Sequence, residues 1–263
     1  MTGSSLTQET APATGLRLQA RGAAAALQFL TVYPALVRSR FAEQELGASV
    51  GYFPLAGLLL GLSLAAFGWV ARAIFPLPVA CVLVIGVWEL FTGALHLDGF
   101  LDSCDGLFGG RTLEDRLRIL RDHHVGAYAV AGGVTILLLR YSALLAAGLP
   151  LTGLVLAAVC GRWAISLSLV ALPYARPDGL GRAMKDHAGP AQAAVATVTA
   201  VAALVALSGV TGLIALALGA VTAAAWAAVV MRRLPGMTGD TYGATCVLVE
   251  TSVLLLLSAR LWA

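Results

Sequence analysis

The chain has 263 residues, of which 59% are hydrophobic and only 12% are charged, with a formal net charge of +3. A soluble domain carries about 25% charged residues, so this composition excludes an ordinary soluble protein. The apolar residues fall in blocks of about 18 to 24, the length of helix that crosses a bilayer core. We therefore expect an all-α integral membrane protein that forms a single polytopic domain over residues 16–263.

The first residues differ from the rest. Residues 1–15 are small and polar and lack the apolar core of a signal peptide, so we expect a disordered N-terminus. An apolar patch follows over residues 22–36 and is interrupted by Pro34. About 15 residues are too few for a crossing, which favours an interfacial or re-entrant helix over a span.

Seven transmembrane helices are predicted after this segment, at residues 51–75, 77–96, 126–147, 151–172, 190–208, 210–230 and 242–261. Tight, uncharged turns alternate with long, basic connections, and most of the 17 Lys and Arg residues lie in or before the long connections. The positive-inside rule places those connections and the N-terminus in the cytoplasm. We therefore expect a multi-pass protein of the cytoplasmic (inner) membrane, in contact with the lipid bilayer, whose active site faces the cytoplasm.

An acidic segment follows the second predicted span. Asp98, Asp102 and Asp105 are spaced i, i+4 and i+7, so a helix would place all three carboxylates on one face. Such carboxylates repel one another at the edge of a low-dielectric layer unless a cation lies between them. Mg²⁺ is held by one or two carboxylates together with substrate phosphates. We favour a metal–diphosphate site; the alternative is that these aspartates cap helices and face water.

Residues near this segment have more than one interpretation. His96 could carry a proton, contact a phosphate, support a metal ligand or be an interfacial structural histidine. Asp122 precedes the next predicted span, where capping of that helix competes with ligand binding. Between them, residues 112–122 predict a short amphipathic helix that Thr112 can cap.

Two polar segments on the same predicted side extend the candidate site. Residues 174–186 form a Gly- and Pro-rich loop with Arg176 and Lys185, which favours contact with a phosphate or nucleotide. Residues 238–243 begin the last predicted span, where Asp240 could cap the helix or reach a ligand.

The predicted spans themselves contain a few ionisable residues. Glu250 needs a polar partner because an ionised carboxylate is costly within a membrane, and Arg140 and Arg162 are candidate partners. The four cysteines form no C-x-x-C pair and are predicted to be small buried hydrophobes rather than disulfides or zinc ligands; they are Cys81, Cys104, Cys160 and Cys246.

Five blocks, in this order, resemble the cobalamin synthase family (adenosylcobinamide-GDP ribazoletransferase). They are F-P-L-A-G-L-L-L-G from Phe53, G-A-L-H-L-D-G-F-L-D-S-C-D-G from Gly93, R-D from Arg121 with Gly126, Y-A-R-P-D-G-L-G from Tyr174 and T-G-D-T-Y-G from Thr238. The segment beginning at Thr31 lacks an arginine that the family usually has. Val247 stands where members commonly carry the first of two acidic residues, and Glu250 retains the second.

The resemblance implies a Mg²⁺-dependent transferase that joins α-ribazole, or its 5′-phosphate, to adenosylcobinamide-GDP and releases GMP. It implies that Asp98, Asp102 and Asp105 bind the metal and that Asp98 is catalytic. His96 or an aspartate is the candidate acceptor of the ribazole hydroxyl proton. The candidates for substrate binding are Arg111, Arg121, Asp122, Arg176, Lys185, Asp240 and Glu250. No nucleic acid is expected as a partner, whereas a homo-oligomer or an association with other corrinoid-pathway enzymes is compatible with the sequence.

Two other functions compete with this interpretation. A CDP-alcohol phosphotransferase of lipid synthesis also uses spaced aspartates, but its D-G-x-x-A-R signature is not matched, because Asp98-Gly99 is followed by Phe-Leu-Asp-Ser. A cation-coupled transporter would carry ionisable residues across the midplane, whereas most of those here gather at one interface.

Overall fold

The computed structural model describes residues 15–122 and 124–259. Over this part of the chain the protein has twelve α-helices, a 3₁₀ turn and a π-helical turn, with one isolated β-bridge and no β-strand. The segment expected to be disordered, residues 1–15, lies outside the described residues except for Gly15, which begins α1.

Among the described residues, six helical segments are long and apolar enough to cross a bilayer, so the expected all-α integral membrane protein is confirmed. These segments are Glu43–Ile74, α7 (Ala127–Ala146), α8 (Leu151–Ala171), α10 (Pro190–Ser208), α11 (Val210–Met231) and α12 (Gly239–Ser258). The first consists of α2 (Glu43–Ser49), the 3₁₀ turn Val50–Tyr52 and α3 (Phe53–Ile74). The shorter helices are α1 (Gly15–Leu30), α4 (Leu77–Thr92), α5 (Leu95–Cys104), α6 (Leu113–Ile119) and α9 (Leu180–His187).

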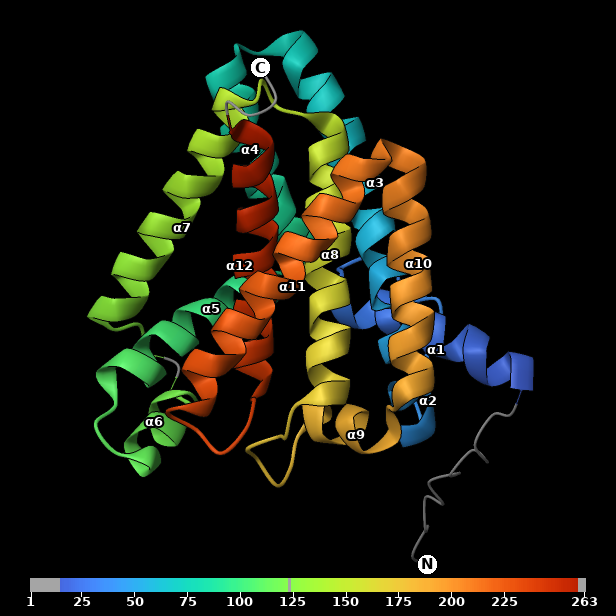
Figure 1. Ribbon diagram of the computed structural model, residues 1–263, viewed down its shortest axis with the longest axis vertical. Helices are drawn as coiled ribbons and strands as arrows, with labels where there is room; N and C mark the ends of the chain where they lie inside the picture. Colours follow the sequence, from blue (N-terminus) through green and yellow to red (C-terminus); the bar gives the residue numbers. More distant parts are fainter. Residues whose placement is uncertain (1–14, 123, 260–263) are drawn as a thin grey trace, which may run out of the picture.

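Helix α8 forms the centre of the bundle, and most of its residues are buried between α3, α10, α11 and α12 (Figure 1). Glycines of α3 permit the closest of these contacts. A Cβ atom on Gly57 would lie 2.5 Å from the Ala158 carbonyl oxygen, and one on Gly61 would lie 2.5 Å from Val155 Cα. Small residues at such contacts let helices in a membrane approach until their backbones touch.

The second predicted span, residues 77–96, is broken in the structure. Helix α4 ends at Thr92, and Gly93 and Ala94 both adopt left-handed backbone conformations, with φ of 59° and 55°. Helix α5 then leaves at 94° to α4 and runs across the bundle (Figure 1), so a seventh crossing exists only if α4 and α5 count as one bent span. The chain bends here because left-handed residues terminate an α-helix. The predicted end of this span, residue 96, was therefore wrong, since α4 ends at Thr92.

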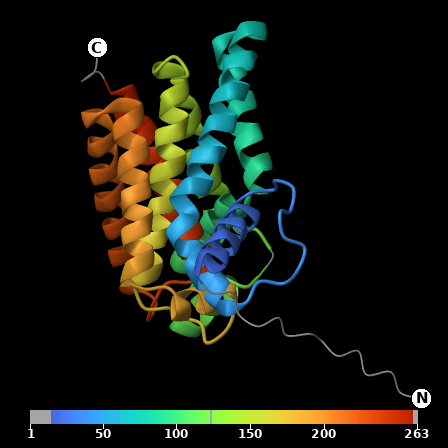
Figure 2. The same cartoon turned by 90° about the vertical axis from the view of Figure 1, so that its right-hand side faces the viewer.

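The two ends of the bundle differ in the way predicted. The turns that join α3 to α4, α7 to α8 and α10 to α11 lie at one end, and α2, α6, α9 and the long connections lie at the other (Figure 1). Helix α1 lies obliquely against α3 near the end that holds the long connections (Figure 2), where Arg21 forms an ion pair with Glu45 of α2. Thr112 accepts a hydrogen bond from the Asp115 amide at 3.1 Å, which confirms the predicted cap of α6.

Candidate active site

A cavity of about 480 Å³ lies between α5, the start of α12 and the loop that joins α8 to α9, near the end of the bundle that carries the long connections. Its polar lining comprises His96, Asp98, Arg121, Arg176, Asp178 and Asp240. Its apolar lining includes Phe29, Phe53, Ile165, Leu169 and Met184, from four different helices. A mostly apolar cleft with a few convergent polar groups is the usual form of a small-molecule site.

Two glycines bring α5 and α12 into contact at the cavity. A Cβ atom on Gly99 would lie 2.9 Å from the Asp240 carbonyl oxygen, and one on Gly243 would lie 3.2 Å from the His96 carbonyl oxygen. Only glycine permits backbones this close. The contact sets Asp98 and Asp240, 142 positions apart in the chain, along the same cavity.

The loop after α8 is hydrogen-bonded to the segment that leads into α12. Parallel backbone hydrogen bonds join Ala175 N to Met237 O and Met237 N to Pro173 O, both at 2.8 Å. Arg176 then donates from Nη2 to Asp240 Oδ2 at 2.6 Å and to the Leu120 carbonyl at 3.1 Å. The two positions that the sequence analysis selected in separate motifs are therefore partners at one wall of the cavity.

Asp240 is not the cap of α12. Thr238 has that role, since its hydroxyl accepts a hydrogen bond from the Thr241 amide at 3.3 Å. The same hydroxyl donates to Asp240 Oδ2 at 3.2 Å, so the carboxylate is held by Thr238 and Arg176 together. The alternative in which Asp240 faces the ligand cavity is the one that the structure supports.

The three aspartates of the acidic segment have different surroundings. Asp98 is exposed at the cavity, and Asp102 lies one turn along α5, near enough to Asp98 and Asp240 to be repelled by their charges. Asp105 is buried, and its carboxylate accepts hydrogen bonds from the amides of Gly126 at 2.6 Å and Ala129 at 2.9 Å. Asp105 thus accepts hydrogen bonds from amides at the start of α7 that have no partner within their own helix. Helix α5 ends at Cys104, and a π-helical turn begins at Asp105.

These positions limit the kind of metal site that the protein can form. Among the residues that the structure describes, no group of three or more His, Cys, Asp or Glu side chains is placed to hold a metal ion. Asp98 and Asp102, at i and i+4 on one helix, do fit Mg²⁺, which takes one or two carboxylates and completes its shell with water and phosphate oxygens. The donor set therefore suits a cation that arrives with a phosphorylated substrate.

The remaining predicted substrate ligands divide between the cavity and its surroundings. Arg121 lines the cavity and pairs with the exposed Asp178 at 3.4 Å. Arg111 is exposed and does not line it. Lys185 donates to the Val170 carbonyl at 2.8 Å, near the end of α8, and burial lowers the pKa of its ammonium group.

Asp122 also lies outside the cavity lining. It accepts hydrogen bonds from the His124 amide at 3.1 Å and pairs with His124 Nδ1 at 2.6 Å. These hydrogen bonds lower the pKa of Asp122 and raise the pKa of His124. The adjacent His123 lies outside the described residues.

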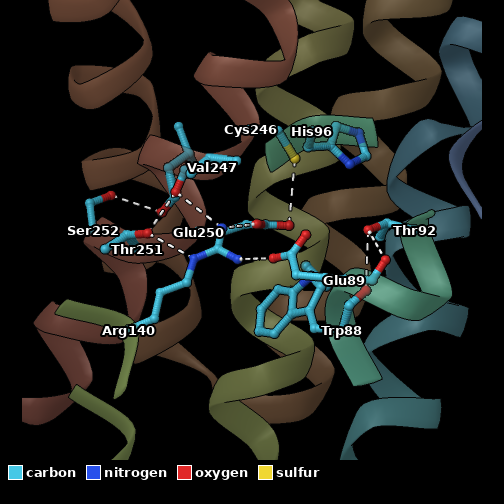
Figure 3. A network of polar contacts seen from close by, with 12 residues as sticks. Trp88, Glu89, Thr92, His96, Arg140, Cys246, Val247, Glu250, Thr251 and Ser252 are labelled. Atoms are coloured by element: carbon cyan, nitrogen blue, oxygen red, sulfur yellow. Dashed lines mark hydrogen bonds and ion pairs between the residues drawn. The ribbon is translucent and has the colours of Figure 1, made fainter. Parts of the chain in front are cut away.

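Glu250 is not part of the cavity lining and lies in a buried ionic network (Figure 3). Arg140 donates to Glu250 Oε2 at 2.5 Å and to Glu89 Oε1 at 3.0 Å, and Arg162 forms an ion pair with the other oxygen of Glu250. The predicted pairing of Glu250 is confirmed, with both candidate arginines as partners. Two guanidinium groups and two carboxylates balance in charge, which offsets the large desolvation cost of each buried ion.

Sequence analysis did not single out two aromatic side chains of the site. Tyr174 and Tyr242 stack with ring centroids 6.1 Å apart and both line the cavity. The Tyr242 hydroxyl is buried and has no hydrogen-bond partner in the described part of the chain. Both residues lie inside the polar motifs quoted above. Their position there was the feature of the sequence that could have marked them as part of the site.

The chain was compared with known proteins. The family model described as cobalamin-5-phosphate synthase matches residues 22–258. A protein of Roseiflexus sp. (strain RS-1), named adenosylcobinamide-GDP ribazoletransferase, is 38% identical over 234 residues, which cover 89% of this chain and 87% of the relative. Relatives with the same name from Desulforamulus reducens and Pseudomonas putida (strain GB-1) are each 40% identical over 237 residues, covering 88% of this chain and 94% and 95% of the relatives. No solved structure matches the chain. Because this family model matches residues 22–258, which is most of its length, the chain belongs to the cobalamin-5-phosphate synthase family.

Proposed function

We propose that this protein is a transferase that joins α-ribazole, or its 5′-phosphate, to adenosylcobinamide-GDP and releases GMP. The observation that carries the proposal is the meeting of α5, α12 and the loop before α9 around one cavity, which is lined by Asp98 of α5, Asp240 of α12, Arg176 and Arg121. This combination of anionic and cationic groups suits a diphosphate that binds with a divalent cation.

The reaction exchanges one phosphate bond for another. A free hydroxyl oxygen of the ribose, which is not the 5′-oxygen because that atom is phosphorylated in α-ribazole 5′-phosphate, forms a bond to the phosphorus that carries the cobinamide. The bond from that phosphorus to the bridging oxygen breaks, and GMP leaves with that oxygen. The hydroxyl proton passes to solvent, because a loose transition state needs little help from a base. The contribution of the protein is therefore to position the two substrates and to neutralise charge.

Named residues supply these functions. Arg176, held by Asp240 and the Leu120 carbonyl, presents a fixed cation at the wall of the cavity, and Arg121 presents a second. Asp98 and Asp102 would hold Mg²⁺, which would offset the charge on the diphosphate and on the departing phosphate. Asp105 keeps its structural role at the start of α7, with no direct part in binding the metal.

The apolar part of the cavity fits the aromatic base of the ribazole. Phe29, Phe53, Leu169 and Met184 line it, and Tyr174 and Tyr242 add a stacked pair. Aromatic and aliphatic side chains bury a flat base by stacking and by the hydrophobic effect. The base would lie there while the phosphates face the arginines.

We further propose that the active site faces the cytoplasm from the inner membrane. The support is the charge distribution. The long, basic connections lie at one end of the bundle (Figure 1), and the loop between α8 and α9, which belongs to that end, lines the cavity. The positive-inside rule orients that end toward the cytoplasm. A single-cysteine variant in the 174–179 loop should react with a membrane-impermeant thiol reagent only in inverted vesicles, with the same substitution in the turn between α7 and α8 as the opposite control.

The test of the activity is GMP release by purified protein in nanodiscs, given adenosylcobinamide-GDP, α-ribazole and Mg²⁺. Release should require both substrates and the metal, and it should stop with a chelator and return when Mg²⁺ is restored. CDP-alcohol substrates run in parallel should give no product. Folded wild-type protein that releases no GMP, or that turns over a CDP-alcohol instead, would overturn the proposal.

A further inference from the structure

His96 connects the cavity to the buried ionic network. It lines the cavity with only 4% of its surface exposed, and its Nδ1 lies 3.4 Å from Arg162 Nη2. Its other ring nitrogen, Nε2, is also buried and has no hydrogen-bond partner among the residues that the structure describes. A buried polar atom left unpaired in this way is costly unless a ligand completes it.

The neighbour of Nδ1 determines where the ring carries its proton. A guanidinium group has only donors and no acceptor. Nδ1 can therefore face Arg162 favourably only if it presents its lone pair. In the neutral ring the proton is then on Nε2, the nitrogen that lacks a partner.

The surrounding network keeps Arg162 in this position. Its Nη1 forms the ion pair with Glu250, whose other carboxylate oxygen accepts from Arg140, and all three side chains are almost completely buried. Arg140 is held in turn by Glu89 and by Thr251 Oγ1 at 3.1 Å (Figure 3). Arg162 is held by Glu250, and Glu250 is held by Arg140. The Arg162 guanidinium therefore cannot turn away from His96 without breaking its ion pair with Glu250.

We propose that His96 is a fixed, neutral hydrogen-bond donor whose Nε2–H binds a phosphate oxygen of the diphosphate substrate, and that Arg162 and Glu250 are positioning residues that select this tautomer. This inference rests on the proposed function and deepens it. It excludes His96 Nε2 as the acceptor of the ribazole proton and as a metal ligand, because both roles need a lone pair on that nitrogen. The role is one of the alternatives that the sequence left open, a phosphate contact.

The tautomer can be measured without any assay of activity. In protein labelled with ¹⁵N-histidine and reconstituted in lipid, solid-state NMR separates ring nitrogens that carry a proton from those that carry a lone pair. The chain has four histidines, so the spectrum of His96→Gln identifies the signals of His96. We expect a protonated Nε2 and a lone pair on Nδ1, and we expect inorganic diphosphate with Mg²⁺ to shift the Nε2 signal. A lone pair on Nε2, or no response of that signal to diphosphate, would overturn the proposal.

Two substitutions test the chemical role. The amide nitrogen of His96→Gln can take the place of Nε2 and still donate, whereas the amide of His96→Asn reaches only the place of Nδ1. Loss of one donor to a reacting oxyanion lowers kcat by about 10²–10³-fold, so the Asn variant should fall by about that factor while the Gln variant retains at least tenfold more activity than Asn. Equal losses in both variants, with both folded, would contradict the donor role.

The two proposals fail in different ways. If the wild-type protein releases no GMP but its NMR spectrum shows the expected tautomer and the response to diphosphate, the proposed reaction is wrong and the anion contact stands. If GMP release is robust and Nε2 carries a lone pair, the reaction stands and the donor role is wrong.

Discussion

Arg176 and Asp240 lie 64 positions apart in the chain and meet through a hydrogen bond of 2.6 Å between Nη2 and Oδ2 at the wall of the cavity. Arg176 also binds the Leu120 carbonyl, so a single guanidinium group ties together α12, the end of α6 and the loop before α9. The guanidinium group at the wall of the cavity is thus held by its own protein contacts, which would reduce the ordering that the binding of a substrate there requires.

Replacement of Arg176 by lysine should therefore impair catalysis although it retains the charge. An ammonium group cannot reproduce the planar arrangement of donors that reaches both acceptors. We expect kcat/KM for GMP release to fall by about 10–100-fold, as for the loss of a hydrogen bond to a charged group worth about 1.5–3 kcal/mol. Arg182→Lys is the matched control, because the described residues give the Arg182 guanidinium one ion pair, with the exposed Asp186, and Arg182 does not line the cavity. Similar losses in both variants would show that the effect is not specific to the cavity.

Asp98 and Asp105 should separate activity from stability. Asp98→Asn should abolish Mg²⁺-dependent GMP release and leave the thermal unfolding temperature nearly unchanged, because Asp98 is exposed at the cavity. Asp105→Asn should lower the stability by about 1–2 kcal/mol, because the start of α7 loses a charged acceptor for two amides. Thermal unfolding in detergent and the GMP assay, run on both variants, would contradict this assignment if the two effects were exchanged.

The contact between α5 and α12 depends on the absence of a side chain at residue 99. Gly99→Ala should push the two helices apart, since the new methyl group would lie 2.9 Å from the Asp240 carbonyl oxygen. Overpacking of this kind costs about 1–3 kcal/mol, and the displacement of Asp98 from Asp240 should lower kcat as well. Gly86→Ala in α4 provides the control, because in the described part of the chain a methyl group there would meet no atom of another helix within 4 Å. Wild-type activity in Gly99→Ala would show that the close approach is not needed.

The buried ionic network predicts a rescue of stability without a rescue of activity. Glu250→Gln leaves two guanidinium groups short of a counter-charge and should destabilise the protein by about 3–5 kcal/mol. Adding Arg162→Met removes one of those charges and should restore much of the stability, whereas kcat should stay low because His96 has lost the group that fixes its tautomer. Thermal unfolding measures the change in stability of the single and double variants, and GMP release measures the change in their kcat. A double variant with wild-type kcat would rule out a positioning role for Arg162.

Much of the fold follows from local properties of the chain. The apolar segments that correspond to α3, α7, α8, α10, α11 and α12 could be located because each is long enough to span a bilayer by itself. Their alternation with basic connections also predicted that the motifs share one end of the bundle. The break after Thr92 escaped prediction, because composition cannot distinguish a helix that ends at Gly93–Ala94 from one that continues.

The site could be predicted only in part, for the same reason. Asp98, Asp240 and Arg176 were selected from their motifs and do line the cavity, because polar residues next to spans are few and their chemistry is specific. The sequence did not indicate which residues these side chains contact. Asp105 has the same residue type and helical spacing as Asp98, yet its carboxylate binds amides of α7.

The sequence by itself determined that this is an all-α membrane protein, which segments other than α4 and α5 are long and apolar enough to cross, and which polar motifs gather at one end. Hydrophobic length and charge placement act locally, so both can be read from the sequence. Only the tertiary structure decided that α5 turns across the bundle, that Arg176 holds Asp240, that two arginines share Glu250, and that one of them, Arg162, faces His96. Those contacts join residues far apart in the chain, and they depend on how glycines and small side chains let the helices pack.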